Sequence, residues 1–230
     1  MPSERSFNPN TTVGTVIVAV VLCLACSLVV SATAVGLRPR IAANKQLKLQ
    51  RNVLIAAGRW QDGYGAEDVE REFASIEKVL VNLPRRGEDF KAGTPANDLP
   101  ADYDPRKASK DPALSVEIPA ELDLAKIKRR EVATPVYLVK EGGKVSLYVL
   151  PVYGKGLWST LYGFVALEAD LRTVRGITFY EHGETPGLGG EIENERWKAL
   201  WPGKVAISEA GEPQIDVIKG RVEAGTPDAE

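Results

Sequence analysis

The chain has 230 residues, of which 44% are hydrophobic and 26% charged, a mixture typical of a globular protein with a hydrophobic core. This length allows one domain or two small ones. The net charge of −2 and the scattered basic residues argue against a nucleic-acid-binding protein, which would concentrate positive charge on one surface.

The N-terminal part predicts one membrane-spanning helix, residues 12–37, after a short tail. No charged residue lies between Arg5 and Arg38. The apolar stretch makes about 37 Å of helix at about 1.5 Å per residue, enough to cross a hydrocarbon core of about 30 Å. A cleaved signal peptide is the alternative, because residues 32–34 have an A-x-A pattern, but its apolar region would be shorter. We therefore expect an uncleaved anchor.

The basic residues beside this helix do not decide its orientation. One arginine precedes the helix, and five basic residues follow it closely: Arg38, Arg40, Lys45, Lys48 and Arg51. This bias would keep the larger part of the chain in the cytoplasm under the positive-inside rule. Long domains cross membranes largely regardless of such charges, so the residues alone leave the side open.

The only two cysteines, Cys23 and Cys26, lie inside the predicted membrane helix. Their C-x-x-C spacing is also found in redox and metal sites. In a lipid-embedded helix we expect them instead to be small apolar packing residues.

Two membrane-proximal helices are predicted in residues 38–83. The first continues out of the membrane over residues 40–60 and ends near Gly58. The second covers Ala66–Leu83, because one apolar stripe recurs there at helical spacing before the helix-ending Pro84. The stripe consists of Val69, Phe73, Ile76 and Leu80.

Residues 84–133 show no periodicity and mix several prolines with aspartate, lysine and glycine. We expect an irregular surface segment here, either a mobile loop or a contact site.

Residues 134–230 predict a β-rich domain. Its first hairpin pairs residues 135–140 with 144–153 across Glu141-Gly142-Gly143, which supplies glycines where a tight turn needs positive φ. The remaining expected elements are a strand pair 159–167 and 174–180, a short helix 194–200, and a strand pair 205–208 and 214–218. Helices combined with antiparallel hairpins predict an α+β fold.

The stretch His182–Gly190 contains the only histidine and four glycines within nine residues. Glycines let a ligand approach the backbone N–H groups closely. Glu184 and Thr185 could pair with polar groups of a planar heterocycle while Leu188 covers its apolar face. A turn-rich connection explains the same composition, so both interpretations stay open. The run is neither a phosphate-binding P-loop nor a dinucleotide fingerprint.

No catalytic or metal-binding constellation is evident. A single histidine, His182, without cysteines nearby cannot build a usual zinc site, and a hydrogen-bonded histidine is expected. Trp158 follows Gly154-Lys155-Gly156 and could cover an aromatic ligand, although its spacing at a strand start favours a core position.

Three motifs together resemble one family: Gly154–Ser159, Gly176–Gly189 with its H-x-E-T-P-G-L-G run, and Trp201-Pro202-Gly203-Lys204. They are similar to the C subunit of the bacterial Na⁺-translocating NADH:quinone reductase and, more distantly, to the G subunit of the Rnf electron-transport complex. The resemblance also covers the anchor and the membrane-proximal helix, and residues 84–130 add little to it.

The resemblance implies a single-pass protein of the bacterial inner membrane, with its domain in the periplasm and other subunits of the reductase as partners. It implies that the protein carries electrons through FMN, in a complex that couples NADH oxidation and quinone reduction to Na⁺ export. The residues expected to border the flavin are Trp158, Glu184, Thr185, Gly187, Leu188 and Gly189.

One motif of the family is not found in this sequence. The family joins FMN through its phosphate to a threonine of an S-G-A-T motif, and no such motif occurs here. Thr226 has different neighbours and is not assigned the role. We therefore expect the acceptor threonine beyond Glu230, with the domain of residues 134–230 continuing to it. The alternatives are an Rnf-type subunit or, if the chain ends at Glu230, a flavin-free anchored scaffold.

Overall fold

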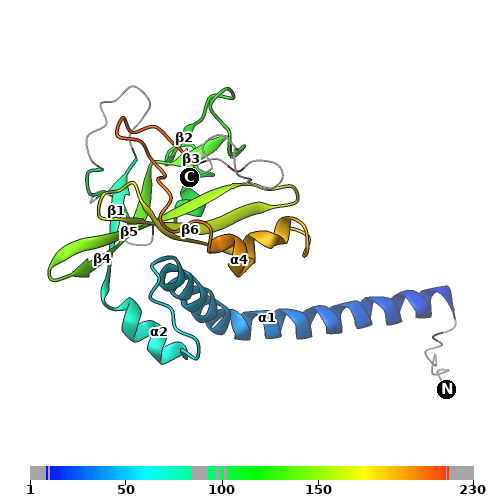
Figure 1. Cartoon of the computed structure of the whole chain (residues 1–230). Coiled ribbons are helices and arrows are strands. Elements are labelled where there is room, and N and C mark those ends of the chain that lie inside the picture. The colour runs from blue at the N-terminus through cyan, green and yellow to red at the C-terminus, as the bar shows by residue number, and fades with distance from the viewer. Residues whose placement is uncertain are drawn as a thin grey trace, which may run out of the picture. The chain divides into compact units, whose positions relative to one another are not determined.

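The structure is a computed structural model that describes residues 9, 11–83, 93–96, 99–100, 103–215 and 217. It divides into two compact units, Met1–Gln46 and Leu47–Glu230. The helix α1, Thr12–Ala56, begins in the first unit and ends in the second (Figure 1).

The part of α1 in the first unit has the properties of a membrane span. Its most apolar window has a mean hydropathy of 2.9, and large apolar side chains such as Leu28 are exposed. A helix satisfies its own backbone hydrogen bonds, so lipid can cover these side chains at little cost. The Thr11 hydroxyl caps the first turn by accepting from the Gly14 N–H at 3.0 Å.

The helix ends where the sequence predicts. Gly58 adopts a φ of +68°, the Arg59 N–H donates to the Leu54 carbonyl, and the Gly58 N–H donates to the Ile55 carbonyl. These two bonds form a Schellman motif, which favours glycine at the left-handed position.

The predicted helix Ala66–Leu83 is wrong in its second half. The structure has a short helix α2, Ala66–Phe73, followed by the strand β1, Ile76–Asn82. The stripe spacing fits a helix, but the C-terminal half contains the β-branched Val79 and Val81, and β1 pairs along its length with β4. Pairing with a distant strand outweighs local periodicity here.

Among the described residues, the main sheet has five antiparallel strands in the order β1-β4-β5-β6-β7. The remaining strands are β4 Ala133–Glu141, β5 Lys144–Lys155, β6 Thr160–Glu168 and β7 Val174–Glu181. The first two predicted hairpins are confirmed. Gly142 and Gly143 have φ values of +59° and +80° in the β4–β5 turn, and Asp170 caps the β6–β7 turn by accepting from the Thr173 N–H and hydroxyl.

The segment expected to be irregular contains secondary structure. Its described part includes a short helix α3, Pro105–Ala108, and two antiparallel strands, β2 Ser115–Glu117 and β3 Arg129–Glu131. Residues 103–131, named the strap below, contact the main sheet through several side chains. The β structure therefore begins before Thr134.

After β7 the chain forms a 3-10 helix η1, Gly189–Glu193, and the helix α4, Glu195–Lys198, near the predicted position. The expected strand pair 205–208 and 214–218 is replaced by isolated bridges, Thr173–Val205 and Ile207–Pro213. Residues 216 and 218, like Thr226, lie outside the described residues.

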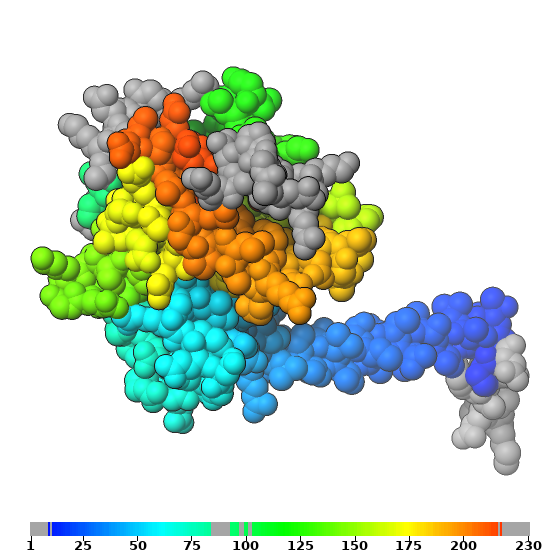
Figure 2. Space-filling view, in the orientation of Figure 1, coloured from blue at the N-terminus to red at the C-terminus, as the bar shows by residue number. Residues whose placement is uncertain are grey.

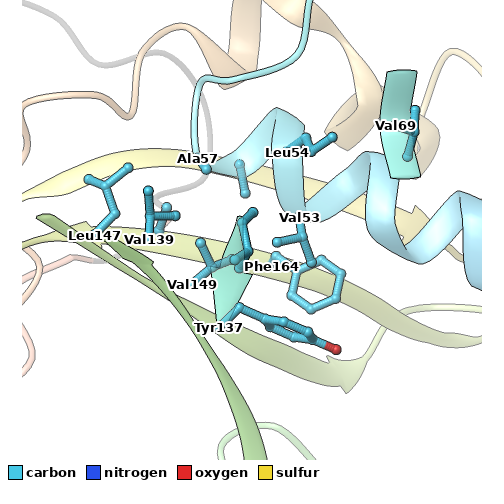
Figure 3. Packing of buried hydrophobic residues seen from close by; sticks show 12 residues of the cluster. Val53, Leu54, Ala57, Val69, Tyr137, Val139, Leu147, Val149 and Phe164 are labelled. Carbon is cyan, nitrogen blue, oxygen red and sulfur yellow. The ribbon is translucent and has the colours of Figure 1, made fainter. Parts of the chain in front are cut away.

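The core of the second unit lies between the end of α1 and the sheet. Figure 3 shows Val53 and Leu54 of α1, and Ala57 directly after it, against Tyr137 and Phe164 of the strands. All five side chains are buried.

A buried polar contact fixes the register of α1 on the sheet. The Thr178 hydroxyl donates to Asn52 Oδ1 at 2.9 Å, and Asn52 Nδ2 donates to the Lys48 carbonyl. Gly176 makes the close approach possible, because a Cβ there would lie 2.5 Å from the Ala56 carbonyl oxygen. The neighbouring Phe179 points to the opposite face, where its ring meets that of Trp197 in α4 at 6.2 Å.

Candidate functional site

Two loops meet through one carboxylate. The first loop, Gly156–Ser159, follows β5, and the second loop, His182–Gly190, follows β7. Glu184 of the second loop accepts hydrogen bonds from three consecutive backbone N–H groups of the first. The donors are Leu157 at 3.2 Å, Trp158 at 3.1 Å and Ser159 at 3.0 Å. These bonds hold the two loops, which are far apart in sequence, side by side.

The Ser159 hydroxyl makes two further contacts between the loops. It lies 3.4 Å from Glu184 Oε1 and accepts from the Gly183 N–H at 2.6 Å. Burial of the Glu184 carboxyl opposes its ionisation, but the N–H bonds from Ser159, Trp158 and Leu157 favour the charged form. The net result is a lowered pKa, so Glu184 is a carboxylate at neutral pH.

Glycines make this junction sterically possible. A Cβ on Gly156 would lie 2.5 Å from Glu184 Oε1, and one on Gly189 would lie 3.0 Å from Glu184 Oε2 and Cβ. Larger residues at either position would displace the carboxylate from its donors.

The second loop turns tightly at Thr185-Pro186-Gly187-Leu188. The Leu188 N–H donates to the Thr185 carbonyl at 3.1 Å, and Gly187 has a φ of +74°. Proline followed by a glycine with positive φ is the signature of a type II turn. The same Thr185 carbonyl accepts from the Gly190 N–H at 3.0 Å, so the chain closes on itself here.

An exposed apolar surface flanks the junction. Leu157, Trp158 and Leu188 are 80%, 68% and 73% exposed, although their backbones are fixed by hydrogen bonds. Three large apolar side chains exposed beside one junction form a candidate binding surface. Figure 2 shows the neighbouring segment of η1 and α4, gold to orange, at the surface of the second unit.

The donor set suits a flavin. Within the described chain, the Thr185 N–H, the Thr185 hydroxyl and the Gly187 N–H have no hydrogen-bond partner, and both residues are exposed. A Cβ built on Gly187 would have no atom within 4 Å, so the backbone is open to a ligand. Unpaired donors beside exposed apolar side chains fit a planar ring system that carries carbonyl and nitrogen acceptors.

His182 has a structural role. Its Nδ1 accepts from the Glu184 N–H at 3.2 Å, and its Nε2 lies 3.1 Å from Glu193 Oε1. This pattern corresponds to a hydrogen-bonded histidine, as expected. In the ranges that the structure describes, no group of three histidine, cysteine, aspartate or glutamate side chains is placed to hold a metal ion.

The six predicted site residues all lie in the two loops, and their contact with a flavin stays a prediction. The spacing argument for a core position of Trp158 is wrong, because the indole is exposed. The sequence predicts that Glu184 pairs with ligand groups; in the structure Glu184 is 8% exposed, and its carboxylate accepts from the backbone of the first loop. Sequence reasoning leaves Ser159 out of the site, although Ser159 ends the Gly154–Ser159 motif.

A cavity of 750 Å³ opens elsewhere, in the strap. It is lined by Glu117, Ile118, Pro119, Ala120, Asp123, Lys126 and Lys128. None of the predicted site residues lines it, and its two carboxylates balance its two ammonium groups.

Known proteins resemble the chain over the same residues. A family described as the FMN-binding domain matches residues 156–221, which include both loops. The C subunit of the Na(+)-translocating NADH-quinone reductase of Pseudomonas aeruginosa is 48% identical over 94% of this chain and 81% of its own length. The C subunit of the same reductase in Yersinia pestis is 43% identical over 100% of this chain and 84% of its own.

Solved structures resemble the fold. The crystal structure of Shewanella oneidensis NqrC superposes with a TM-score of 0.67 at 39% identity, covering 80% of this chain and 81% of that one. The C subunit of the reductase from Parabacteroides distasonis, at 22% identity and a TM-score of 0.53, covers 77% of this chain and 73% of that one and shares the fold.

Proposed function

The chain belongs to the family formed by the C subunits of the Na⁺-translocating NADH-quinone reductases, and from this we propose that it carries electrons through FMN held at the two loops. The observation that supports the site most strongly is the Glu184 junction, which fixes an exposed tryptophan and an exposed turn beside one another. The identity to these C subunits favours this role over an Rnf-type subunit. FMN, when bound, supplies the one-electron chemistry.

The residues of the two loops offer different kinds of contact to the flavin. Trp158 and Leu188 offer apolar cover to the isoalloxazine, and Leu157 extends this cover. The Thr185 hydroxyl and N–H and the Gly187 N–H offer donors to the ring or ribityl oxygens. Gly189 keeps the backbone close to Glu184. No side chain is required to transfer protons or to form bonds with a substrate, so we assign no catalytic residue.

The Glu184 carboxylate contributes to the electrostatics of the site. A negative charge near a flavin disfavours the addition of electrons and lowers the reduction potential. The backbone N–H dipoles around Glu184 offset part of this charge and keep it in one place. The potential is therefore expected to depend on the junction.

Three finer proposals follow from the family resemblance. The first is that FMN is joined covalently, through its phosphate, to a threonine hydroxyl. The second is that the domain lies in the periplasm, with α1 as a single pass through the inner membrane. The third is that electron transfer through this protein contributes to Na⁺ export by the complex.

A denaturing gel tests the flavin proposal. The protein with its natural C-terminus, expressed in a host that attaches flavins and purified in detergent, should give a fluorescent band under ultraviolet light after denaturation. A dark band together with flavin released into the supernatant would support binding but contradict covalent attachment. A protein without any flavin would overturn the proposed carrier function and favour a flavin-free scaffold.

Side-specific labelling tests the orientation. Ser208 is partly exposed. A cysteine introduced at this position should react with a membrane-impermeant maleimide in intact spheroplasts. A cysteine that reacts only after lysis would place the domain in the cytoplasm and contradict the proposal. Cys23 and Cys26 are replaced by serine in this experiment so that only one thiol reports.

A further inference from the structure

The strap contacts the sheet at the ends of the strands that precede the two loops. Arg106 of α3 donates to the Tyr180 hydroxyl at 3.1 Å and to both carboxylate oxygens of Glu181, at 2.9 and 3.1 Å. Its guanidinium also lies 3.7 Å from the centroid of the Tyr162 ring. One side chain therefore joins the strap to both β6 and β7.

Two further contacts join the strap to β5. The Lys155 N–H donates to the Ala125 carbonyl at 2.8 Å. The Tyr153 hydroxyl donates to Glu131, which is 4% exposed, and the Tyr153 ring stacks on that of Tyr162 at 5.8 Å. The contacts of the strap thus cover three adjacent strands.

These contacts fall directly beside the loops. Lys155 precedes Gly156, the first residue of the first loop, and Glu181 precedes His182, the first residue of the second. The strap is therefore bonded to the last residue of each strand before the chain enters the site. A loop is positioned by the strand ends from which it starts, so the strap restricts both loops at their origin.

The chemistry of Arg106 suits this role. The planar guanidinium can stack on a tyrosine ring and donate several bonds in its own plane at once, which a lysine ammonium cannot do. The N-terminal turn of α3 is pre-ordered, because Asp104 caps it by accepting from the Arg106 N–H at 2.9 Å. Arg106 therefore extends from a fixed backbone.

We infer that Arg106 is a positioning residue for the flavin site, acting through Tyr180 and Glu181 on the orientation of the two loops. This inference rests on the proposed function, because it gives the strap a part in holding the flavin. It predicts that the strap affects the site without touching the flavin.

Arg106→Ala tests the inference, with Arg59→Ala as the matched control. Arg59 also makes a long-range pair with a glutamate, Glu141, at 3.0 Å, but at the other end of the sheet, beside the β4–β5 turn. Both variants lose one partly exposed arginine–glutamate pair. The full chain is used in detergent, well below its unfolding temperature.

Hydrogen exchange gives a readout that does not need the flavin. The amides of Leu157, Trp158 and Ser159 should exchange roughly tenfold faster in Arg106→Ala, because their bonds to Glu184 open more often. Arg59→Ala should leave them unchanged. Equal exchange in the unmodified protein and Arg106→Ala would overturn the inference even if the protein carries no flavin.

The flavin gives the second readout. In protein that carries flavin, Arg106→Ala should shift the reduction potential and the visible circular dichroism, and Arg106→Lys should restore them only in part. A variant that melts earlier but keeps both properties would show that Arg106 only stabilises the fold, which contradicts the inference. Protein without flavin would instead overturn the proposed function, and the exchange experiment would still decide the role of Arg106.

Discussion

The Glu184 carboxylate and the Ser159 backbone N–H, 25 residues apart in the chain, lie 3.0 Å from one another. This hydrogen bond and its two neighbours join the loop after β5 to the loop after β7. The two strands need only bring the loops near, and the carboxylate then sets their relative position. The proposed flavin site therefore depends on a buried carboxylate that is bonded to the backbone of the first loop.

Glu184→Gln should weaken this junction. An amide offers one acceptor oxygen and turns its NH₂ group toward N–H donors, so some of the three backbone bonds are lost. The variant should unfold at a lower temperature at neutral pH and shift the flavin potential upward, because a negative charge is removed. Glu209→Gln, at a highly exposed position, is the control and should change neither property.

The same residue predicts a pH dependence. The pKa of Glu184 is lowered in the folded protein, so its contribution to stability is present above the ordinary glutamate value of 4.5. The contribution is lost as the pH falls from there through the lowered pKa. Thermal unfolding should therefore show a smaller loss of stability on acidification in Glu184→Gln than in the unmodified protein. Parallel pH profiles would contradict a role for the charged form.

Gly187→Val and Gly189→Val should disturb the flavin site and leave the anchor inserted. Valine is strained at the positive φ of Gly187, and a Cβ at position 189 would press on Glu184. Flavin content and spectra report the site, and membrane fractionation reports insertion. Gly211→Val introduces the same strain at a φ of +82° in a distant turn, so it should leave the flavin spectra unchanged.

Trp158→Ala should change the flavin fluorescence and leave the stability of the fold almost unchanged. The indole is largely exposed, so its removal should alter the free energy of unfolding by no more than about 0.5 kcal/mol. If the indole lies against the isoalloxazine, its removal should raise the flavin fluorescence, while Trp158→Phe keeps an aromatic cover. Fluorescence that stays the same in both variants would remove Trp158 from the site.

Thr178→Val should destabilise the second unit. The substitution leaves the buried Asn52 carbonyl without its hydroxyl donor, which costs about 1–3 kcal/mol. Thr178→Ser keeps the donor and should lose less. Urea unfolding of the detergent-solubilised chain measures the difference, and a larger loss in Thr178→Ser than in Thr178→Val would show that packing of the methyl group matters more than the bond.

The sequence predicts those features that depend on local physics. The anchor follows from a long uncharged stretch, the end of α1 from Gly58, and the β4–β5 turn from Gly142 and Gly143. The turn at Gly187 likewise follows from proline before glycine. Each of these features is determined by residues that are close together in the sequence.

Features that depend on distant partners cannot be predicted in this way. Residues 76–82 have helical spacing and form a strand because β4 is available to pair with them. Arg106 is one charge among several in a segment without periodicity, and only the fold brings it to Glu181. Glu184 belongs to the predicted site, but its donors lie in another loop, so its role at the junction requires the structure.

The most direct test of the account is an equilibrium redox titration of the flavin in the purified full chain, compared with Gly189→Val. The account predicts a flavin that is reduced and reoxidised reversibly, at a potential different from that of free FMN and shifted by the variant. A potential that equals that of free FMN in both proteins would contradict the claim that the two loops hold the flavin.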